Sequence, residues 1–367
     1  EVSEKLSLFK RIDGHAPGLS GEDLCSYVSR GILSDHECTT AEEAEEKLLL
    51  GQFIFLREGD AAKNVEALTP AVTQATASRC CFATDDRHVD SIAEDGSIDN
   101  CIRTAVRAGM PLELALRIAT LSAADYYCLH DRGIIAPGRC ADFCILDEGE
   151  TFKVSRVYKN GIAVSKKGTA EAEKIEFPKF VCSIPGEDEM KLPSGMLRVI
   201  ETIPGEIITE AGIGQEGDEG VQKIICVDRY RGEGFGVGLI KGLNIRQGAI
   251  ATSVSHDAHN IIAAGASDAE IISAVKAVSE AGGGMAVVIG DETTVLSLPA
   301  GGLMTFKPYE EVLDEMAVLN EALEKTGADK KAFMSLSFMA LTVVPHLKIT
   351  PRGLFDGDSF SDTDIQC

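Results

Sequence analysis

Three residues with metal-ligand chemistry follow three short apolar stretches near the start of the sequence. His15, His36 and Asp85 stand where apolar residues give way to polar ones, in "FKRIDGHAP", "ILSDHE" and "RCCFATDDRH". Two imidazoles and a carboxylate are a ligand set that suits Mn²⁺, Fe²⁺ or Zn²⁺. Such an ion lowers the pKa of its bound water toward ~7 and makes a hydroxide nucleophile. A carboxylate beside it, here Asp85, can take up a proton and pass it to a leaving group.

Other charged residues stand beside these three. Asp86 follows Asp85, and because side chains alternate along a strand it points to the other face. It is a candidate contact for a substrate N–H, and a helix-capping or ion-paired aspartate is the alternative. Arg57 and Glu58 end the apolar stretch "QFIFLREG". They are candidate substrate-binding residues, and an ion pair between them is the alternative.

A second group of polar residues lies in the motif "SHDAHN". His256 and His259 would face opposite sides of a strand, but in a turn they can converge with Asp257. These three residues are candidate substrate contacts. The nearby "GFGVGLIKG" has glycine spacing of the kind found in dinucleotide sites, but it lacks the strand, turn and helix context. We therefore predict no dinucleotide cofactor.

The elements that position the first group follow one repeated layout. Within residues 1–110 an apolar strand is followed four times by a helix, with Ser20 predicted as one N-cap and Thr40 with Glu43 as a capping box. Alternating strands and helices predict a parallel sheet, and reactive residues at successive strand ends indicate the C-terminal face of a (β/α)₈ barrel. Only four units are present, and the sequence begins at Glu1. We therefore expect residues 1–130 to form strands five to eight, the C-terminal half of such a barrel.

The rest of the sequence predicts two further segments. Residues 131–172 read as a small β-domain, a β-sandwich segment with a hairpin around Asn160-Gly161. Residues 173–367 read as an α+β domain. It contains a capped helix over 267–282 and an amphipathic helix in "PYEEVLDEMAVLNEALEKTG". The predicted fold class is therefore α/β, with three segments.

Composition narrows the class of function. The chain has 367 residues and a formal net charge of −23, which disfavours nucleic acid and anionic membranes as partners. It has no apolar run of membrane-spanning length and no signal-peptide pattern, so we expect a cytoplasmic protein with a small-molecule substrate. Its eleven cysteines are scattered without a CxxC pair, which indicates reduced thiols and disfavours a cysteine metal site.

Taken together, several motifs resemble those of bacterial and archaeal adenine deaminases, which belong to the metal-dependent amidohydrolase superfamily. The resemblance covers nearly all of the chain and includes the C-terminal domain peculiar to that family. The motifs are "DGHAPGLSG", "SDHECTTAEEA", "LREGDAAKN", "TDDRH", "LHDRGIIAPGRCAD" and "SVSHDAHNII".

The resemblance implies hydrolytic deamination of adenine to hypoxanthine and ammonia, a reaction of purine salvage. It implies a centre of two divalent metals, Mn²⁺ or Fe²⁺, whose hydroxide attacks C6 of the purine. His15 and His36 match the ligands of strands five and six, and Asp85 matches the strand-eight carboxylate that binds metal and shuttles the proton. It also implies a homo-oligomer, and a "SHDAHN" loop that helps to bind or enclose the substrate.

One part of the family pattern is absent from the sequence. The family's first-strand HxH pair and its strand-four carboxylate would precede Glu1. Two alternatives therefore stand beside adenine deamination. One is another amidohydrolase that acts on a cyclic amide or an amino-purine. The other is a truncated, non-catalytic remnant that lacks the N-terminal metal ligands.

Overall fold

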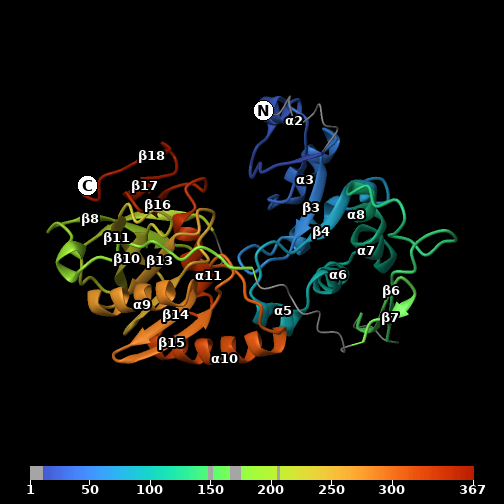
Figure 1. Cartoon of the computed structure of the whole chain (residues 1–367). Helices are drawn as coiled ribbons and strands as arrows, with labels where there is room; N and C mark the ends of the chain where they lie inside the picture. The colour runs from blue at the N-terminus through green and yellow to red at the C-terminus, as the bar shows by residue number, and fades with distance from the viewer. Residues whose placement is uncertain (1–10, 148–151, 166–174, 205–206) are drawn as a thin grey trace. The chain divides into compact units, whose positions relative to one another are not determined.

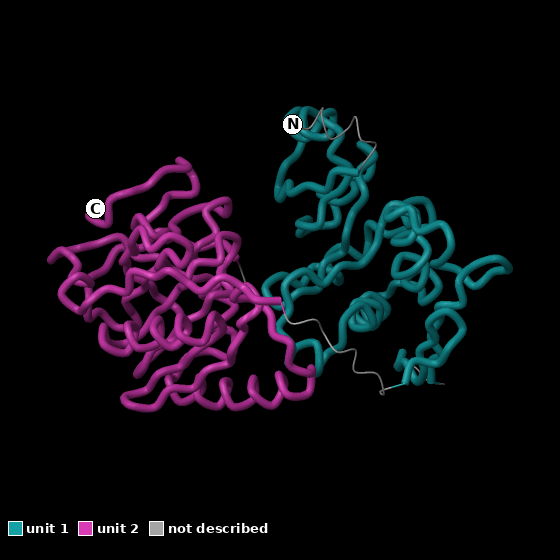
Figure 2. The backbone as a smooth tube through the Cα atoms, viewed as in Figure 1, with its two compact units in different colours: residues 1–170 teal, residues 171–367 magenta. Residues whose placement is uncertain are grey.

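The chain divides into two compact units, residues 1–170 and 171–367 (Figure 2). The computed structural model describes residues 11–147, 152–165, 175–204 and 207–367. Each unit has a hydrophobic core of its own and is described by itself. The three-segment boundaries suggested by the sequence remain a prediction.

The first unit contains a parallel sheet of four strands (Figure 1). Each strand pairs in parallel with the next strand along the chain, as the sequence predicted. Every residue of the third strand is buried, which is typical of a parallel strand covered on both faces. Because all four strands run the same way, their carboxyl ends lie at one edge of the sheet. The strands are β1 (Ile12–Asp13), β2 (Ile32–Asp35), β3 (Phe53–Arg57) and β4 (Cys80–Ala83).

Helices follow these strands, with two departures from the prediction. The Thr40 hydroxyl caps its helix by accepting a hydrogen bond from Glu43 N–H, but Ser20 makes no side-chain capping bond. The helix expected after β3 is only four residues long, and a 3₁₀ turn containing Pro70 continues it. Proline lacks the N–H that a longer α-helix would need. The helices of the unit are α2 (Gly21–Val28), α3 (Ala41–Leu49), α4 (Val65–Leu68), α5 (Val89–Asp95), α6 (Ile98–Arg107), α7 (Leu112–Ala119) and α8 (Leu121–Tyr126).

Alternate residues of the sheet pack on different partners. Ile54 and Leu56 belong to a large cluster with residues of α3, α4, α6 and α7. Phe53 and Phe55 face the other way and pack against Tyr126 of α8. Burial of a large apolar side chain stabilises a fold by about 1.5–3 kcal/mol. The two-residue alternation of side chains therefore packs both faces of the sheet against helices.

A three-stranded antiparallel sheet completes the first unit. The predicted hairpin is confirmed, because Asn160 and Gly161 link two paired strands and both have positive φ, at 50° and 76°. Two consecutive residues with positive φ define the turn that matches strand twist, and asparagine and glycine tolerate it best. The strands are β5 (Phe143–Leu146), β6 (Val154–Lys159) and β7 (Ile162–Ala163).

The second unit is built on an eight-stranded sheet in the order β15-β14-β12-β13-β10-β11-β8-β9. Its pairs are antiparallel except for β8 with β11. The predicted capped helix is confirmed as α9 (Asp268–Glu280), in which Ser267 caps by accepting from Glu270 N–H. The helix packs on the sheet. The strands are β8 (Leu197–Thr202), β9 (Thr209–Gly214), β10 (Val221–Val227), β11 (Phe235–Lys241), β12 (Ala249–Thr252), β13 (Ile261–Gly265), β14 (Gly284–Ile289) and β15 (Glu292–Ser297).

The last part of the chain adds a second small sheet and two α-helices (Figure 1). The predicted amphipathic helix is confirmed, with Met316, Leu319 and Leu323 buried along one stripe. Among the described residues, no helix is both long and apolar enough to cross a membrane. The added elements are α10 (Tyr309–Thr326), α11 (Ala332–Ser337), β16 (Leu347–Thr350), β17 (Gly353–Asp356) and β18 (Ser361–Asp362).

Candidate active site

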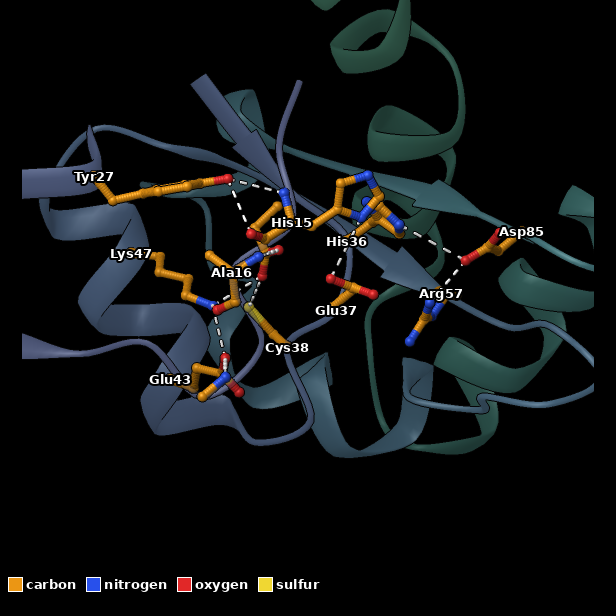
Figure 3. A network of polar contacts seen from close by, with 12 residues as sticks. His15, Ala16, Tyr27, His36, Glu37, Cys38, Glu43, Lys47, Arg57 and Asp85 are labelled. Carbon is orange, nitrogen blue, oxygen red and sulfur yellow. Dashed lines mark hydrogen bonds and ion pairs between the residues drawn. The ribbon is translucent and has the colours of Figure 1, made fainter. Parts of the chain in front are cut away.

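Two of the predicted ligands, His15 and His36, lie side by side where β1 and β2 end (Figure 3). Their ring centroids are 4.8 Å apart and the rings meet edge to face at 75°. The His15 side chain is 73% exposed, whereas that of His36 is 23% exposed. Two imidazoles this close, at one edge of a parallel sheet, can bind the same cation.

Asp85 lies just beyond β4 and reaches both His36 and Arg57. Its Oδ2 is 3.8 Å from His36 Nε2 and accepts a hydrogen bond of 2.7 Å from Arg57 Nη1 (Figure 3). Asp85 has a positive φ of 58°, a conformation that aspartate tolerates better than most residues. Arg57 is the last residue of β3, and its side chain is only 9% exposed. Arg57 thus pairs with Asp85 rather than with Glu58.

The structure adds Glu37, a carboxylate that the sequence reasoning missed. Glu37 Oε2 lies 3.5 Å from His15 Nδ1, and one ligand atom from each of His15, His36 and Glu37 lies within 4.8 Å of the others. Glu37 Oε2 is buried, and no described residue forms a hydrogen bond with it. Its position directly after His36 is the sequence signal that could have identified it as a ligand, because adjacent residues in a short loop can reach the same metal site.

The other candidates in the first unit have structural contacts. The buried Glu58 carboxylate accepts a hydrogen bond of 3.3 Å from the N–H of Val65, at the start of α4. Burial raises the pKa of Glu58. The Asp86 carbonyl accepts from Asp60 N–H at 2.9 Å, which ties the ends of β3 and β4 together. The substrate-binding roles of Arg57, Glu58 and Asp86 remain predictions.

His256, Asp257 and His259 belong to the second unit, in the segment between β12 and β13. The ring centroids of the two histidines are 6.2 Å apart. The His256 ring stacks on Phe338, with centroids 4.5 Å apart and an angle of 13°. The segment is therefore a turn in which the two rings lie near each other, and its role toward a substrate remains a prediction.

A hydroxyl group holds the backbone of His15. The Tyr27 hydroxyl accepts from His15 N–H at 2.9 Å and donates to the His15 carbonyl at 3.0 Å. A Cβ atom at Gly14 would collide with this hydroxyl and with the side chain of Ile32, so a larger residue there would displace one of them. These contacts set the backbone direction as the chain leaves β1.

A buried ion-pair network joins α3 to the two segments that carry the histidines. In the sequence, α3 reads as a highly charged helix. Lys47 of α3 is fully buried, and its Nζ donates to Asp35 Oδ2 at 2.9 Å, to Glu43 Oε1 at 2.6 Å and to the Ala16 carbonyl at 2.6 Å. Burial alone would raise the pKa of Asp35, but the hydrogen bond and charge of Lys47 outweigh it and lower this pKa. The same partners raise the pKa of Lys47 against the effect of its burial. Both groups are therefore charged at neutral pH.

Two models of protein families match this chain, and the first of them gives the class of the first unit. Residues 7–164 match the model of the amidohydrolase family, so the first unit, with ligand-type residues at the ends of parallel strands, is of amidohydrolase type. Residues 202–361 match the model of the adenine deaminase C-terminal domain. A solved structure of a β-aspartyl dipeptidase from Fervidobacterium islandicum is 21% identical, with a TM-score of 0.33 over 44% of this chain and 49% of that one.

Whole-chain relatives narrow the class to one family. A protein of Methanoculleus marisnigri named adenine deaminase is 47% identical over 374 residues, which cover 100% of this chain and 72% of the relative. An adenine deaminase of Methanoregula boonei is 46% identical, covering 99% of this chain and 67% of the relative. The chain belongs to the adenine deaminase family.

The amidohydrolase family implies a divalent metal cofactor, and the residues at the strand ends fit one. Imidazole and carboxylate ligands suit Mn²⁺, Fe²⁺ and Zn²⁺. His15, His36 and Glu37 offer ligand atoms within 4.8 Å of one another, and the buried Oε2 of Glu37 has no hydrogen bond within the described part of the chain. A cation bound there would satisfy that oxygen. Asp85 offers a further carboxylate beside His36.

Proposed function

We propose that this chain hydrolyses the exocyclic C6–N bond of adenine, giving hypoxanthine and ammonia, in purine salvage. The observation that carries the proposal is the match to adenine deaminases at 46–47% identity over 99–100% of the chain. The cluster of His15, His36 and Asp85 supports it, because hydrolysis of an amidine carbon needs an activated water and a proton carrier. Adenine would be the small-molecule partner of a cytoplasmic homo-oligomer.

His15, His36 and Asp85 would hold the metal, and Glu37 is a further ligand candidate from the same strand end. We propose Mn²⁺ or Fe²⁺, with two ions in each complete centre. When bound, such an ion supplies an acidified water as the nucleophile. His36 is the residue common to both groups, because it lies near His15 and Glu37 on one side and near Asp85 on the other.

Asp85 would carry the proton. Its carboxylate takes a proton from the attacking water and delivers it to the departing amine, so that one C–O bond forms and one C–N bond breaks. The hydrogen bond from Arg57 holds Oδ2, while Oδ1 has no hydrogen bond to a described residue. Arg57 thus orients the carboxylate and leaves one oxygen to exchange the proton. Because the leaving amine departs as neutral ammonia, the Asp85 carboxylate ends the cycle ionised, as it began.

Polar side chains would recognise the purine itself. Asp86 and Glu58 are the candidates from the first unit, and the segment with His256, Asp257 and His259 is the candidate from the second. A carboxylate can accept a hydrogen bond from a purine N–H, and a histidine can either donate or accept. These substrate contacts are part of the proposal.

The test is release of ammonia and the change in ultraviolet absorbance when the Mn²⁺-loaded chain is incubated with adenine. Asp85→Asn should lower kcat by about 10²-fold or more, because general acid–base catalysis contributes at least that much. The exposed Asp125 of α8 is the matched control, and Asp125→Asn should leave kcat unchanged. Ring opening of a cyclic amide, or ammonia from another amino-purine, without ammonia from adenine would support the other amidohydrolase function. Turnover of none of these by a chain that binds Mn²⁺ would refute the proposal.

A further inference from the structure

The ammonium group of Lys47 joins the two loops that carry the candidate ligands. Its three protons have three acceptors, one in the loop after β1, one in β2 and one within α3. A lysine ammonium has three donors, so its hydrogen-bonding capacity is fully used. Because the side chain is fully buried, water does not compete for these bonds. The three hydrogen bonds point in different directions and together fix the position of the ammonium group.

The loop after β1 is held by two hydrogen bonds to the backbone of Ala16. Ala16 directly follows His15, and its carbonyl accepts from Lys47 Nζ while its N–H donates to Asp35 Oδ1 at 3.1 Å. Asp35 directly precedes His36 and also accepts from Lys47. One residue next to each histidine is therefore hydrogen-bonded to the same ammonium group, and the two residues are hydrogen-bonded to each other. Figure 3 shows Ala16 beside Lys47.

Glu43 extends the same connection to the outer parts of both loops. Its Oε1, which accepts from Lys47, also accepts from Gly18 N–H at 2.8 Å. Its Oε2 accepts from Thr39 N–H at 3.0 Å. The carboxylate thus spans from the segment after His15 to the segment after His36. Among the described residues, none of these hydrogen bonds ends on the side chain of His15 or His36, so the network acts on the backbone that carries them.

We infer that Lys47 is a positioning residue of the metal centre, which sets the separation of His15 and His36 through Asp35 and Ala16. The inference rests on the proposed function, because it requires these histidines to bind metal. A buried ion pair is weak evidence for stability, since apolar residues of similar volume often replace it at no cost. Removal of groups that orient metal ligands, in contrast, typically weakens metal binding by 10–100-fold.

The experiment measures Mn²⁺ affinity by calorimetric titration with MnCl₂, at a temperature where circular dichroism shows each protein to be folded. Lys47→Met should raise the Kd for Mn²⁺ by about 10–100-fold. The matched control is Lys223 of β10, a buried lysine of the second unit that pairs with Asp268 and Glu216. Lys223→Met removes a similar ion pair and should leave the Kd for Mn²⁺ unchanged.

A second variant serves if Lys47→Met does not fold, because that change leaves Asp35 charged and buried. The double variant Asp35→Asn with Lys47→Met removes both charges and should show the same loss of Mn²⁺ affinity. Wild-type affinity in a folded variant would overturn the inference, and so would failure of both variants to fold, which would assign Lys47 to general stability. A wild-type chain that binds no Mn²⁺ would instead refute the metal centre, and the inference with it.

Discussion

Lys348 offers a direct test of how burial acts on charge in the second unit. It lies in β16 and is fully buried, and its Nζ donates to the carbonyl of Ile207 at 3.0 Å. The structure shows no ion pair between Lys348 and a described residue. Burial lowers the pKa of Lys348 to about 8, from an ordinary value of 10.5. We predict that Lys348→Met stabilises the protein at neutral pH.

The magnitude follows from the two pKa values. Below about pH 8 the lysine is charged in both the folded and the unfolded state, and burial of that charge costs roughly 3 kcal/mol for a difference of this size. Between about pH 8 and 10.5 the unfolded state binds more protons, so the free energy of unfolding contributed by this group rises with pH. Above that range both states are neutral and the cost is gone. Loss of the hydrogen bond to Ile207 subtracts about 1 kcal/mol from the gain.

The assay is urea unfolding followed by circular dichroism at several pH values. Lys348→Met should raise the free energy of unfolding by about 2 kcal/mol at neutral pH, and the gain should disappear as the pH approaches 10.5. The control is Lys330→Met, since the Lys330 side chain is 84% exposed and its substitution should change stability by less than about 0.5 kcal/mol. A gain that does not depend on pH, or a loss at neutral pH, would refute the reasoning.

Two further predictions concern the backbone around the metal ligands. Tyr27→Phe removes both hydrogen bonds to the backbone of His15 and should cost about 1–2 kcal/mol of stability and weaken Mn²⁺ binding, as read by urea unfolding and calorimetry. Unchanged Mn²⁺ affinity would show that the hydroxyl does not position His15. Gly59→Ala places a Cβ 2.6 Å from the Thr84 carbonyl and should displace the segment that leads to Asp85. A fall in kcat is expected, whereas full activity of a folded variant would contradict this account.

The elements that position the site could be predicted because their signals are local. Each strand of the first unit is a short apolar run, and each such run ends in polar residues that the parallel sheet brings to one edge. The cap at Thr40 and the turn at Asn160-Gly161 depend on neighbouring residues alone, and both are confirmed. The pairing of His15 with His36 followed from the same logic, because parallel strands place their carboxyl ends together.

What sequence reasoning missed depends on distant contacts. Lys47 lies in "AEEAEEKLL", which reads as a solvated helical face, yet tertiary packing buries it completely. Its partners Ala16 and Asp35 are 31 and 12 residues away, beyond the reach of any helical or strand period. Glu37 was missed for a different reason. One ligand was expected at each strand end, so the residue that directly follows His36 was not considered as a second ligand.

The candidate ligands all come from a short part of the chain, with consequences for how the site assembles. His15, His36 and Asp85 lie within the first unit, and in the described part of the chain the strands that precede them pair with their sequence neighbours. Closing such loops costs little chain entropy, since the cost grows slowly with loop length. During synthesis these ligands can therefore meet before the second unit has emerged from the ribosome.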